Sequence, residues 1–203
     1  WRFSFQTAVT MHKSWSRKDW LEYMMVARNQ LSLGDKFFTI PFTDNNINQA
    51  YNRAAEMGII KNSILQGKGN WAGFLAEEAL ASYLDANIDA DSSYDYDLLY
   101  KGIRIEVKTK RRTVIPKGHY EVSINETSLH QDPDLYVFMQ VQFSHTSCRI
   151  DSLVGLWVLG IKTPKDFFQT ARFVPKGEYD YRNNFTNKAN MYNLEIQYLD
   201  SLK

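Results

Sequence analysis

Cysteine, proline and long hydrophobic runs are scarce in this sequence of 203 residues. Its one cysteine, Cys148, excludes an internal disulfide and a multi-cysteine metal cage, and it suits a reducing compartment. No uninterrupted apolar run reaches the roughly 18 residues of a membrane-spanning helix, so we expect no membrane partner. Five prolines are too few for a long stiff linker. These absences predict a soluble protein of the cytoplasm.

Charge of one sign is not in excess either, because 24 Lys and Arg residues oppose 23 Asp and Glu residues. The net charge of +1 predicts no global basic field that would attract a nucleic acid. The charges are nevertheless segregated: residues 69–100 hold seven acids and no Lys or Arg, and residues 101–120 hold seven bases and one acid, Glu106. This segregation suits a divalent cation held beside a polyanion, and the alternative is a dipolar, solvated surface.

The apolar periodicity predicts a mixed α/β protein. Residues 1–65 are expected to form a mostly helical extension and residues 66–203 the main domain, unless the two are one continuous domain. Apolar residues three and four apart predict helices at 16–34, 44–60, 70–86 and 164–171. The expected strands are a hairpin within 94–110 and single strands at 135–143, 153–161 and 191–199.

The segment IRIEVKTK carries the most informative pattern. Side chains alternate along a strand, so Glu106 and Lys108 share one face, about 7 Å apart, while the three apolar residues share the other. Asp97 lies nine residues before Glu106, across the expected Lys101-Gly102 turn, where its carboxylate can face that of Glu106. Two carboxylates at that distance repel each other unless a cation neutralises them, and Mg²⁺ prefers such oxygen ligands.

The pattern Asp97-x8-Glu106-x-Lys108 resembles the PD-(D/E)xK nuclease superfamily. A Gly-x-x-x-Glu element in the preceding helix, from Gly73 to Glu77, is similar to that family as well. The resemblance covers residues 69–143, and the strand–helix–strand order expected after them extends it to Leu202. It implies a restriction-endonuclease-like αβββαβ core, in which a mixed central sheet is flanked by helices.

The resemblance also implies the roles of the site residues. Glu77, Asp97 and Glu106 would hold Mg²⁺, for which Mn²⁺ can substitute, and Lys108 would position or activate the attacking water. Tyr96 stands where the family name implies proline, which leaves Asp95 as a rival to Asp97. Glu78 is likewise a rival to Glu77.

A basic stretch after this motif is the candidate nucleic-acid surface, and a solvated loop is the alternative. The side chains expected to follow a phosphate backbone are Lys110, Arg111, Arg112 and Lys117. Gln140 and Gln142 alternate on one face of a predicted strand and are accessory candidates, with a buried structural role as the alternative. Tyr179, Tyr181, Arg182 and Asn183 form a polar aromatic loop that either stacks on bases or is plain surface.

The expected function is Mg²⁺-dependent endonuclease cleavage of DNA in a prokaryotic or phage-infected cell. A homodimer would allow two sites to cut two strands. Two alternatives stay open. One is a nuclease acting on RNA or on branched or single-stranded DNA, and the other is a nucleic-acid-binding protein that has this fold without catalysis.

Overall fold

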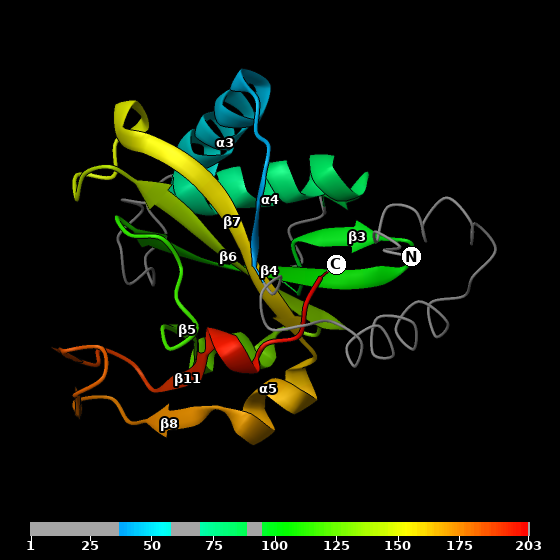
Figure 1. The fold of residues 1–203 in the computed structure, drawn as a ribbon. Helices are drawn as coiled ribbons and strands as arrows, with labels where there is room; N and C mark the ends of the chain where they lie inside the picture. Colours follow the sequence, from blue (N-terminus) through cyan, green and yellow to red (C-terminus); the bar gives the residue numbers. More distant parts are fainter. Residues whose placement is uncertain (1–36, 58–69, 89–94, 203) are drawn as a thin grey trace, which may run out of the picture.

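A mixed sheet of six strands forms the centre of the computed structural model, which describes residues 37–57, 70–88 and 95–202 (Figure 1). The strand order is β1-β7-β6-β4-β3-β2, in which β4 and β6 run parallel and every other neighbouring pair is antiparallel. The strand bounds are β1 Phe38–Ile40, β2 Asn87–Ile88, β3 Leu98–Tyr100, β4 Ile103–Arg112, β6 Leu135–Phe143 and β7 Leu153–Lys162.

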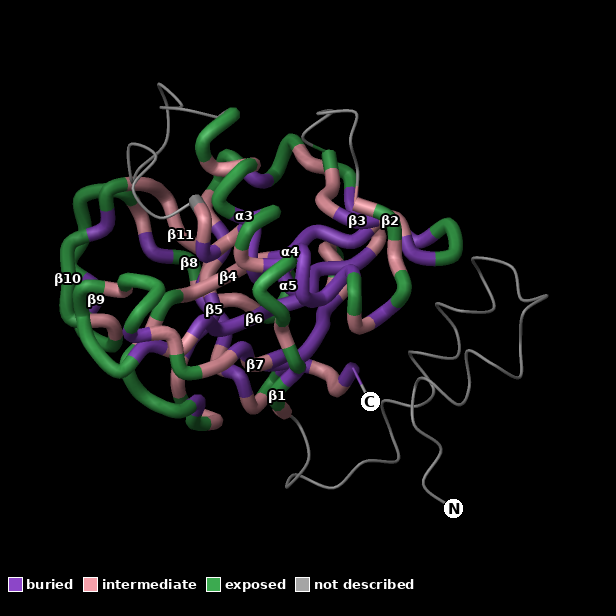
Figure 2. Tube along the Cα trace, turned by 90° about the horizontal axis from the view of Figure 1, so that it is seen from above, coloured by how far each residue is buried: buried purple, intermediate pink, exposed green. Residues whose placement is uncertain are grey.

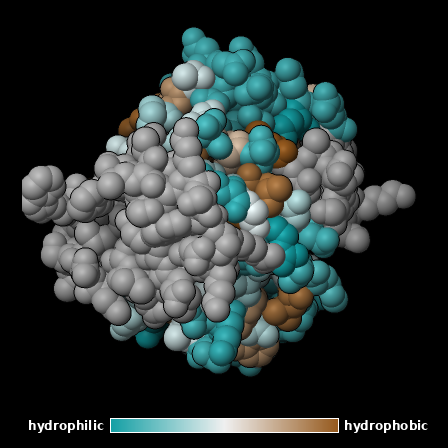
Figure 3. All heavy atoms as spheres, turned by 90° about the vertical axis from the view of Figure 1, so that its right-hand side faces the viewer, coloured by the Kyte–Doolittle hydropathy of each residue, from teal (hydrophilic) through white to brown (hydrophobic). Residues whose placement is uncertain are grey.

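Two helices cover one face of this sheet. Helix α4 (Asn70–Leu84) lies directly on the sheet, and α3 (Asp44–Met57) packs on α4 from outside (Figure 1). Because α4 is covered on both sides, it is apolar around most of its circumference, and it appears almost wholly buried in Figure 2. The outer side of α3 is polar, as the hydrophilic top of Figure 3 shows.

A second layer covers the opposite face of the sheet. It contains α5 (Pro164–Thr170) and a three-stranded sheet in the order β5-β11-β8, with bounds Glu121–Asn125, Met191–Glu195 and Arg172–Val174. Aromatic side chains fill the space between the layers, where the Phe138 and Phe167 rings stack at 5.2 Å and Tyr136 packs edge-on to Phe167. A small hairpin of β9 (Tyr179–Asp180) and β10 (Phe185–Thr186) extends from this layer.

The structure confirms the predicted α/β class and the mixed central sheet. The predicted strand at 135–143 has the bounds of β6, and the predicted hairpin is β3-β4, with Lys101 and Gly102 at φ of 50° and 81° in its turn. The predicted helix at 16–34 lies outside the described residues. In the 37–57 segment, β1 pairs with β7, so this part of the predicted extension shares the core of the main domain.

The chain after β4 departs from the expected order. Between the parallel strands β4 and β6, where no element was predicted, the crossover runs through β5 and a 3-10 helix, η2 (Glu126–His130). The predicted last strand, β11, pairs with β5 and β8 in the second sheet and does not join the central one. None of the described helices combines the length and the apolar character needed to cross a membrane.

Candidate active site

Strand β4 directs Glu106 and Lys108 toward the second layer. Glu106 lies beside Tyr136 and Lys108 beside Phe138 in the β4-β6 register, and both aromatic residues belong to the core between the sheets. Lys108 Nζ donates to Glu106 Oε1 over 2.7 Å, although both side chains are mostly shielded from water. The predicted alternation therefore brings a carboxylate and an ammonium group into direct contact.

Gln131, which follows η2, holds both members of this pair. Its Nε2 donates to Glu106 Oε1 over 2.8 Å, and its Oε1 accepts from Lys108 Nζ over 2.9 Å. Ser128 Oγ accepts a further hydrogen bond from Lys108 Nζ over 3.0 Å. The Lys108 ammonium group is thus held in place by hydrogen bonds to three oxygen acceptors, of which only Glu106 was predicted from the sequence.

Asp97 lies where β3 begins, next to the backbone of β4. Its Oδ2 accepts from Val107 N over 2.7 Å, and its own N–H donates to the Ile105 carbonyl over 2.9 Å. These two bonds place the Asp97 carboxylate beside the residue that follows Glu106. Asp95, the rival in the sequence, is exposed, whereas Asp97 is half-buried. The geometry therefore favours Asp97 as the member of the site.

Glu77 reaches the site from α4, where it is only 8 % exposed. Arg53 of α3 lies over the Phe74 ring and pairs with two adjacent carboxylates: Nη2 is 2.8 Å from Glu77 Oε2, and Nη1 donates to Glu78 Oε1 over 3.1 Å. The contact with Glu77 Oε2 is an ion pair whose angles fall short of a hydrogen bond. Arg53 is a third residue of the site, after Ser128 and Gln131, that sequence reasoning missed.

The charges of three carboxylates act on one another. Burial is the main cause that raises the pKa of Glu77 to about 7; the charges of Glu106 and Glu78 act in the same direction, and Arg53 opposes them. Burial together with the charges of Glu77 and Glu106 raises the pKa of Asp97 well above its usual value. Glu77 is therefore electrostatically part of the same cluster as Asp97 and Glu106, which we call the acidic centre.

The acidic centre has the donor chemistry of a site for a hard dication. Within the described residues, no hydrogen-bond donor reaches the buried Glu106 Oε2. Raised carboxylate pKa values and such an unsatisfied oxygen both indicate negative charge that the protein itself does not fully neutralise. In the described part of the chain, however, no three His, Cys, Asp or Glu side chains are already arranged to hold an ion. Arg53 and Lys108 occupy part of the space around the carboxylates instead.

The predicted phosphate-binding residues divide into two pairs. Lys110 Nζ donates to Glu121 O and Ser123 Oγ, both over 2.8 Å, and burial lowers the pKa of Lys110 to about 8. Arg112 donates to the same Glu121 carbonyl over 3.1 Å. Both side chains thus brace β5. Arg111 and Lys117 are exposed and remain available to an outside ligand.

The two predicted accessory glutamines make structural hydrogen bonds. Gln140 is fully buried, and its Nε2 donates to the Val114 carbonyl over 2.7 Å. Gln142 Oε1 accepts from Trp157 Nε1 over 2.8 Å. They lie beside Lys110 and Arg112 in the β4-β6 register, past the acidic centre, so their observed partners fit the structural alternative.

Comparisons with known proteins add no relative to this description. No protein-family model matches the chain, and no curated protein matches it. The acidic centre and the groups around it are therefore the features that point to a function.

Proposed function

We propose that the protein is a metal-dependent nuclease that hydrolyses phosphodiester bonds in DNA, with a core of the restriction-endonuclease type. The observation that carries the proposal is the acidic centre beside Lys108: three electrostatically coupled carboxylates with an ammonium group bonded to one of them. The PD-(D/E)xK resemblance implies this set of groups, and a helix, a strand start and a strand contribute them from separate parts of the fold.

The sheet topology supports the same proposal. The antiparallel β3-β4 hairpin carries Asp97, Glu106 and Lys108, the parallel neighbour β6 supports β4 from the other side, and α4 supplies Glu77. An α-helix, a hairpin and a parallel crossover in this order agree with the first part of the αβββαβ arrangement. The three-stranded sheet β5-β11-β8 is an addition to that arrangement.

Glu77, Asp97 and Glu106 would hold Mg²⁺ or Mn²⁺ through their carboxylate oxygens. When bound, the dication supplies positive charge that offsets the charge developing on the phosphoryl group and lowers the pKa of a coordinated water. The protein's own part would be to supply three carboxylates whose charges already act on one another in a poorly solvated site. Arg53 pairs with both Glu77 and Glu78, so it would keep one carboxylate partner if Glu77 were to bind the ion.

Lys108 is the residue we assign to the attacking water and the phosphoryl oxygen. Its three N–H groups donate to Glu106, Ser128 and Gln131, so the protein fixes the place of its positive charge in the site. A preorganised ammonium group stabilises developing negative charge without reorientation during the reaction. Glu106, which would hold the cation, accepts from Lys108, so the two groups are adjacent; a water or phosphoryl oxygen would bond Lys108 in exchange for one of its present acceptors.

Arg111 and Lys117 are the exposed cations that we assign to the phosphate backbone. Contacts of this kind give affinity without sequence preference and make binding sensitive to salt. A homodimer, which would bring two acidic centres to two strands, stays an expectation.

The proposal is tested by incubating the full chain with supercoiled plasmid DNA and Mg²⁺, Mn²⁺ or EDTA. We expect nicked and linear products with either ion and none with EDTA. Glu106→Gln and Lys108→Ala should each lower the cleavage rate by about 100-fold or more, because each removes charge at the acidic centre.

Matched controls separate this outcome from a general loss of folding or charge. Glu56→Gln on the outer side of α3 and Lys165→Ala on α5 alter exposed charges of the same types and should cleave like the unchanged protein. Cleavage that survives both Glu106→Gln and Lys108→Ala, or that persists in EDTA, would refute the proposal. Salt-sensitive binding without any cleavage would favour the non-catalytic alternative.

A further inference from the structure

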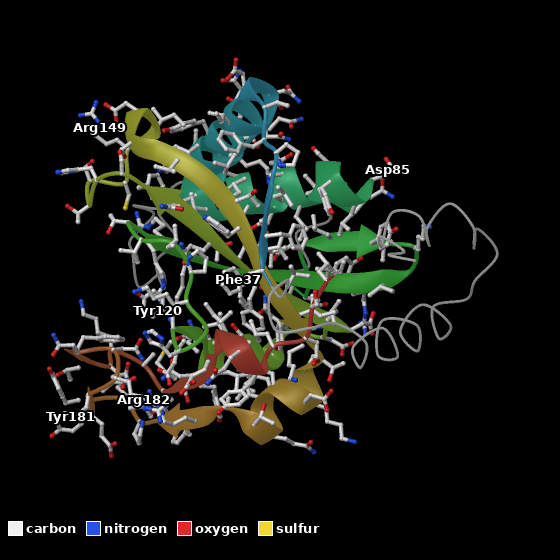
Figure 4. All side chains as sticks on the ribbon, in the orientation of Figure 1. Phe37, Asp85, Tyr120, Arg149, Tyr181 and Arg182 are labelled. Atoms are coloured by element: carbon white, nitrogen blue, oxygen red, sulfur yellow. The ribbon has the colours of Figure 1, made fainter. Side chains whose placement is uncertain are left out.

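The β9-β10 hairpin exposes aromatic rings at the outer end of the second layer. Tyr181 is 87 % exposed, the highest value among the large hydrophobic side chains of the described residues, and Tyr179 and Phe185 are 44 % and 47 % exposed. The Tyr179 and Tyr181 rings meet edge to face with their centres 4.9 Å apart. Figure 4 shows Tyr181 at the tip of the hairpin, pointing away from the protein. This much exposed ring surface indicates a ligand with a flat apolar face.

The hairpin is held rigidly by a buried acid between the two tyrosines. Asp180 is only 2 % exposed, and its carboxylate accepts from Arg172 Nη2 over 3.0 Å, from Asn183 Nδ2 over 2.9 Å and from Arg182 N over 3.1 Å. Tyr179 adds a hydrogen bond from its hydroxyl to Asn184 Oδ1. Rings presented on a fixed backbone lose little conformational entropy when a ligand binds them.

The charge around the hairpin fits a polyanion. In residues 175–188, the exposed charged side chains are three cations, Lys176, Arg182 and Lys188, and one anion, Glu178. Arg182 is paired with Glu195 over 2.7 Å, so Lys176 and Lys188 are the cations that this argument uses. The remaining acid, Asp180, is buried and already paired with Arg172. A nucleic-acid strand is a ligand of this kind, because its backbone is anionic and its bases have flat apolar faces.

Glu121 joins this hairpin to the strand that carries the acidic centre. Its carboxylate accepts from Arg172 and Asn183 on the hairpin side, and its backbone carbonyl accepts from Lys110 and Arg112 of β4. Lys110 and Arg112 follow Lys108 at intervals of two residues on the same face of β4. The hairpin therefore lies at one end of a row of groups that begins at Glu106.

We propose that the β9-β10 hairpin stacks its tyrosines on unpaired bases of a nucleic-acid strand whose phosphates pass the basic end of β4. The inference rests on the proposed function for the class of polymer and adds that the polymer is single-stranded where it meets the hairpin. Bases inside a duplex are already stacked on one another, so their faces are closed to Tyr181. Unpaired bases offer both faces, and stacking on an aromatic side chain tolerates any base.

Binding in EDTA tests the inference without cleavage. Fluorescence anisotropy with labelled oligothymidine should show about tenfold or greater weakening for Tyr181→Ala, because one base loses its stacking partner. Tyr181→Trp keeps a ring and should bind like the unchanged protein. Tyr51→Ala is the matched control, since Tyr51 is an exposed tyrosine on α3, on the other side of the central sheet. The same label in oligothymidine annealed to oligoadenosine should report weaker binding that Tyr181→Ala does not alter.

The outcomes separate this inference from the proposed function. If Tyr181→Ala binds single strands like the unchanged protein, or if it weakens duplex binding equally, the stacking role is wrong even when plasmid cleavage is present. If Tyr181→Ala instead dissociates a dimer in gel filtration while strand binding is unchanged, the tyrosines contact a second copy and the inference also fails. Selective loss of single-strand binding supports it, and this holds whether or not the protein cleaves.

Discussion

Among the described residues, two groups of largely buried acids differ in how far the neighbouring side chains neutralise them. One is the acidic centre of Glu77, Asp97 and Glu106. The other, which we call the anchor cluster, comprises Glu121 and Asp180 with the donors around them. In the anchor cluster, every carboxylate oxygen of both acids accepts at least one hydrogen bond, from Arg172, Arg182, Asn183 or Asn193.

The pKa of Asp180 in the anchor cluster is lowered, whereas the pKa values of Glu77 and Asp97 in the acidic centre are raised. Hydrogen bonds from Asn183 and Arg172 lower the pKa of Asp180 against the effect of burial. Burial and mutual repulsion raise the pKa values of Glu77 and Asp97. Burial alone therefore does not mark a functional acid, because Asp180 is as deeply buried as any of them. A candidate functional acid is instead a buried carboxylate whose pKa stays raised because neighbouring hydrogen-bond donors do not offset its burial.

The largest stability effect should come from the anchor cluster. Asp180→Ala leaves Arg172 without one of its two carboxylate partners and releases the hairpin, so we expect the free energy of unfolding to fall by about 3–5 kcal/mol. Glu77→Gln in the acidic centre removes a charge that the fold stabilises poorly, and it should leave stability unchanged or raise it. Urea unfolding of both variants in EDTA checks this. Equal destabilisation by the two substitutions would erase the distinction between the clusters.

The pH dependence of stability should separate the two clusters as well. Between pH 4.5 and about 7, the native protein keeps the Glu77 proton that the unfolded chain has lost, so stability falls as pH rises through this window. The full fall for this group is about 3 kcal/mol, and Glu77→Gln should remove it. Asp180, whose pKa is lowered, works in the opposite sense: its contribution is lost as pH drops below 3.8. Urea unfolding across pH, in EDTA, measures both. A wild-type curve that rises with pH through the first window would contradict the assigned electrostatics.

Added Mg²⁺ or Mn²⁺ should act on the acidic centre alone. A cation that binds only the native state stabilises it by about 2.7 kcal/mol at a concentration 100 times its dissociation constant. We expect the rise in melting temperature to be larger at neutral than at acidic pH, because Glu77 and Asp97 must release protons to bind the ion. Glu106→Gln should abolish the rise, whereas Glu56→Gln should keep it. A rise that survives Glu106→Gln would place the ion elsewhere.

The parts of the fold that the sequence predicted are the long periodic ones. Strands β4 and β6 alternate or run apolar over nine or ten residues, and helix α4 repeats its apolar positions over four turns. Strands β5, β8, β9 and β10 were missed because they have only two to five residues. Strands β5 and β8 exist because β11, which is distant from β5 in the sequence, supplies their hydrogen bonds, whereas β9 and β10 pair with each other.

The same division applies to the candidate site. Asp97, Glu106 and Lys108 were predictable because one hairpin brings them together within twelve residues of sequence. Arg53 and Gln131 come from α3 and from the end of η2, and only tertiary packing brings them to Glu77 and Glu106. Neither stands in a motif, so the sequence held no signal for them. Lys110, in turn, is of a residue type that often binds phosphate, but its ammonium group is hydrogen-bonded to β5.

Gln131 offers the finest comparison, because it is uncharged and its removal changes only how Lys108 and Glu106 are held. Gln131→Leu removes one bond to each, so we expect kcat to fall about tenfold, the equivalent of about 1.4 kcal/mol, while KM stays constant. Gln169→Leu, at an exposed position of α5, is the matched control and should cleave normally. Single-turnover cleavage and urea unfolding, measured on the same preparations, separate positioning from folding. A positioning role is refuted if KM rises at unchanged kcat, or if the loss of activity is matched by an equal loss of stability. In either case the orientation of Lys108 would depend on Glu106 and Ser128, and the uncompensated charge of the acidic centre would be the sole feature that distinguishes it from the anchor cluster.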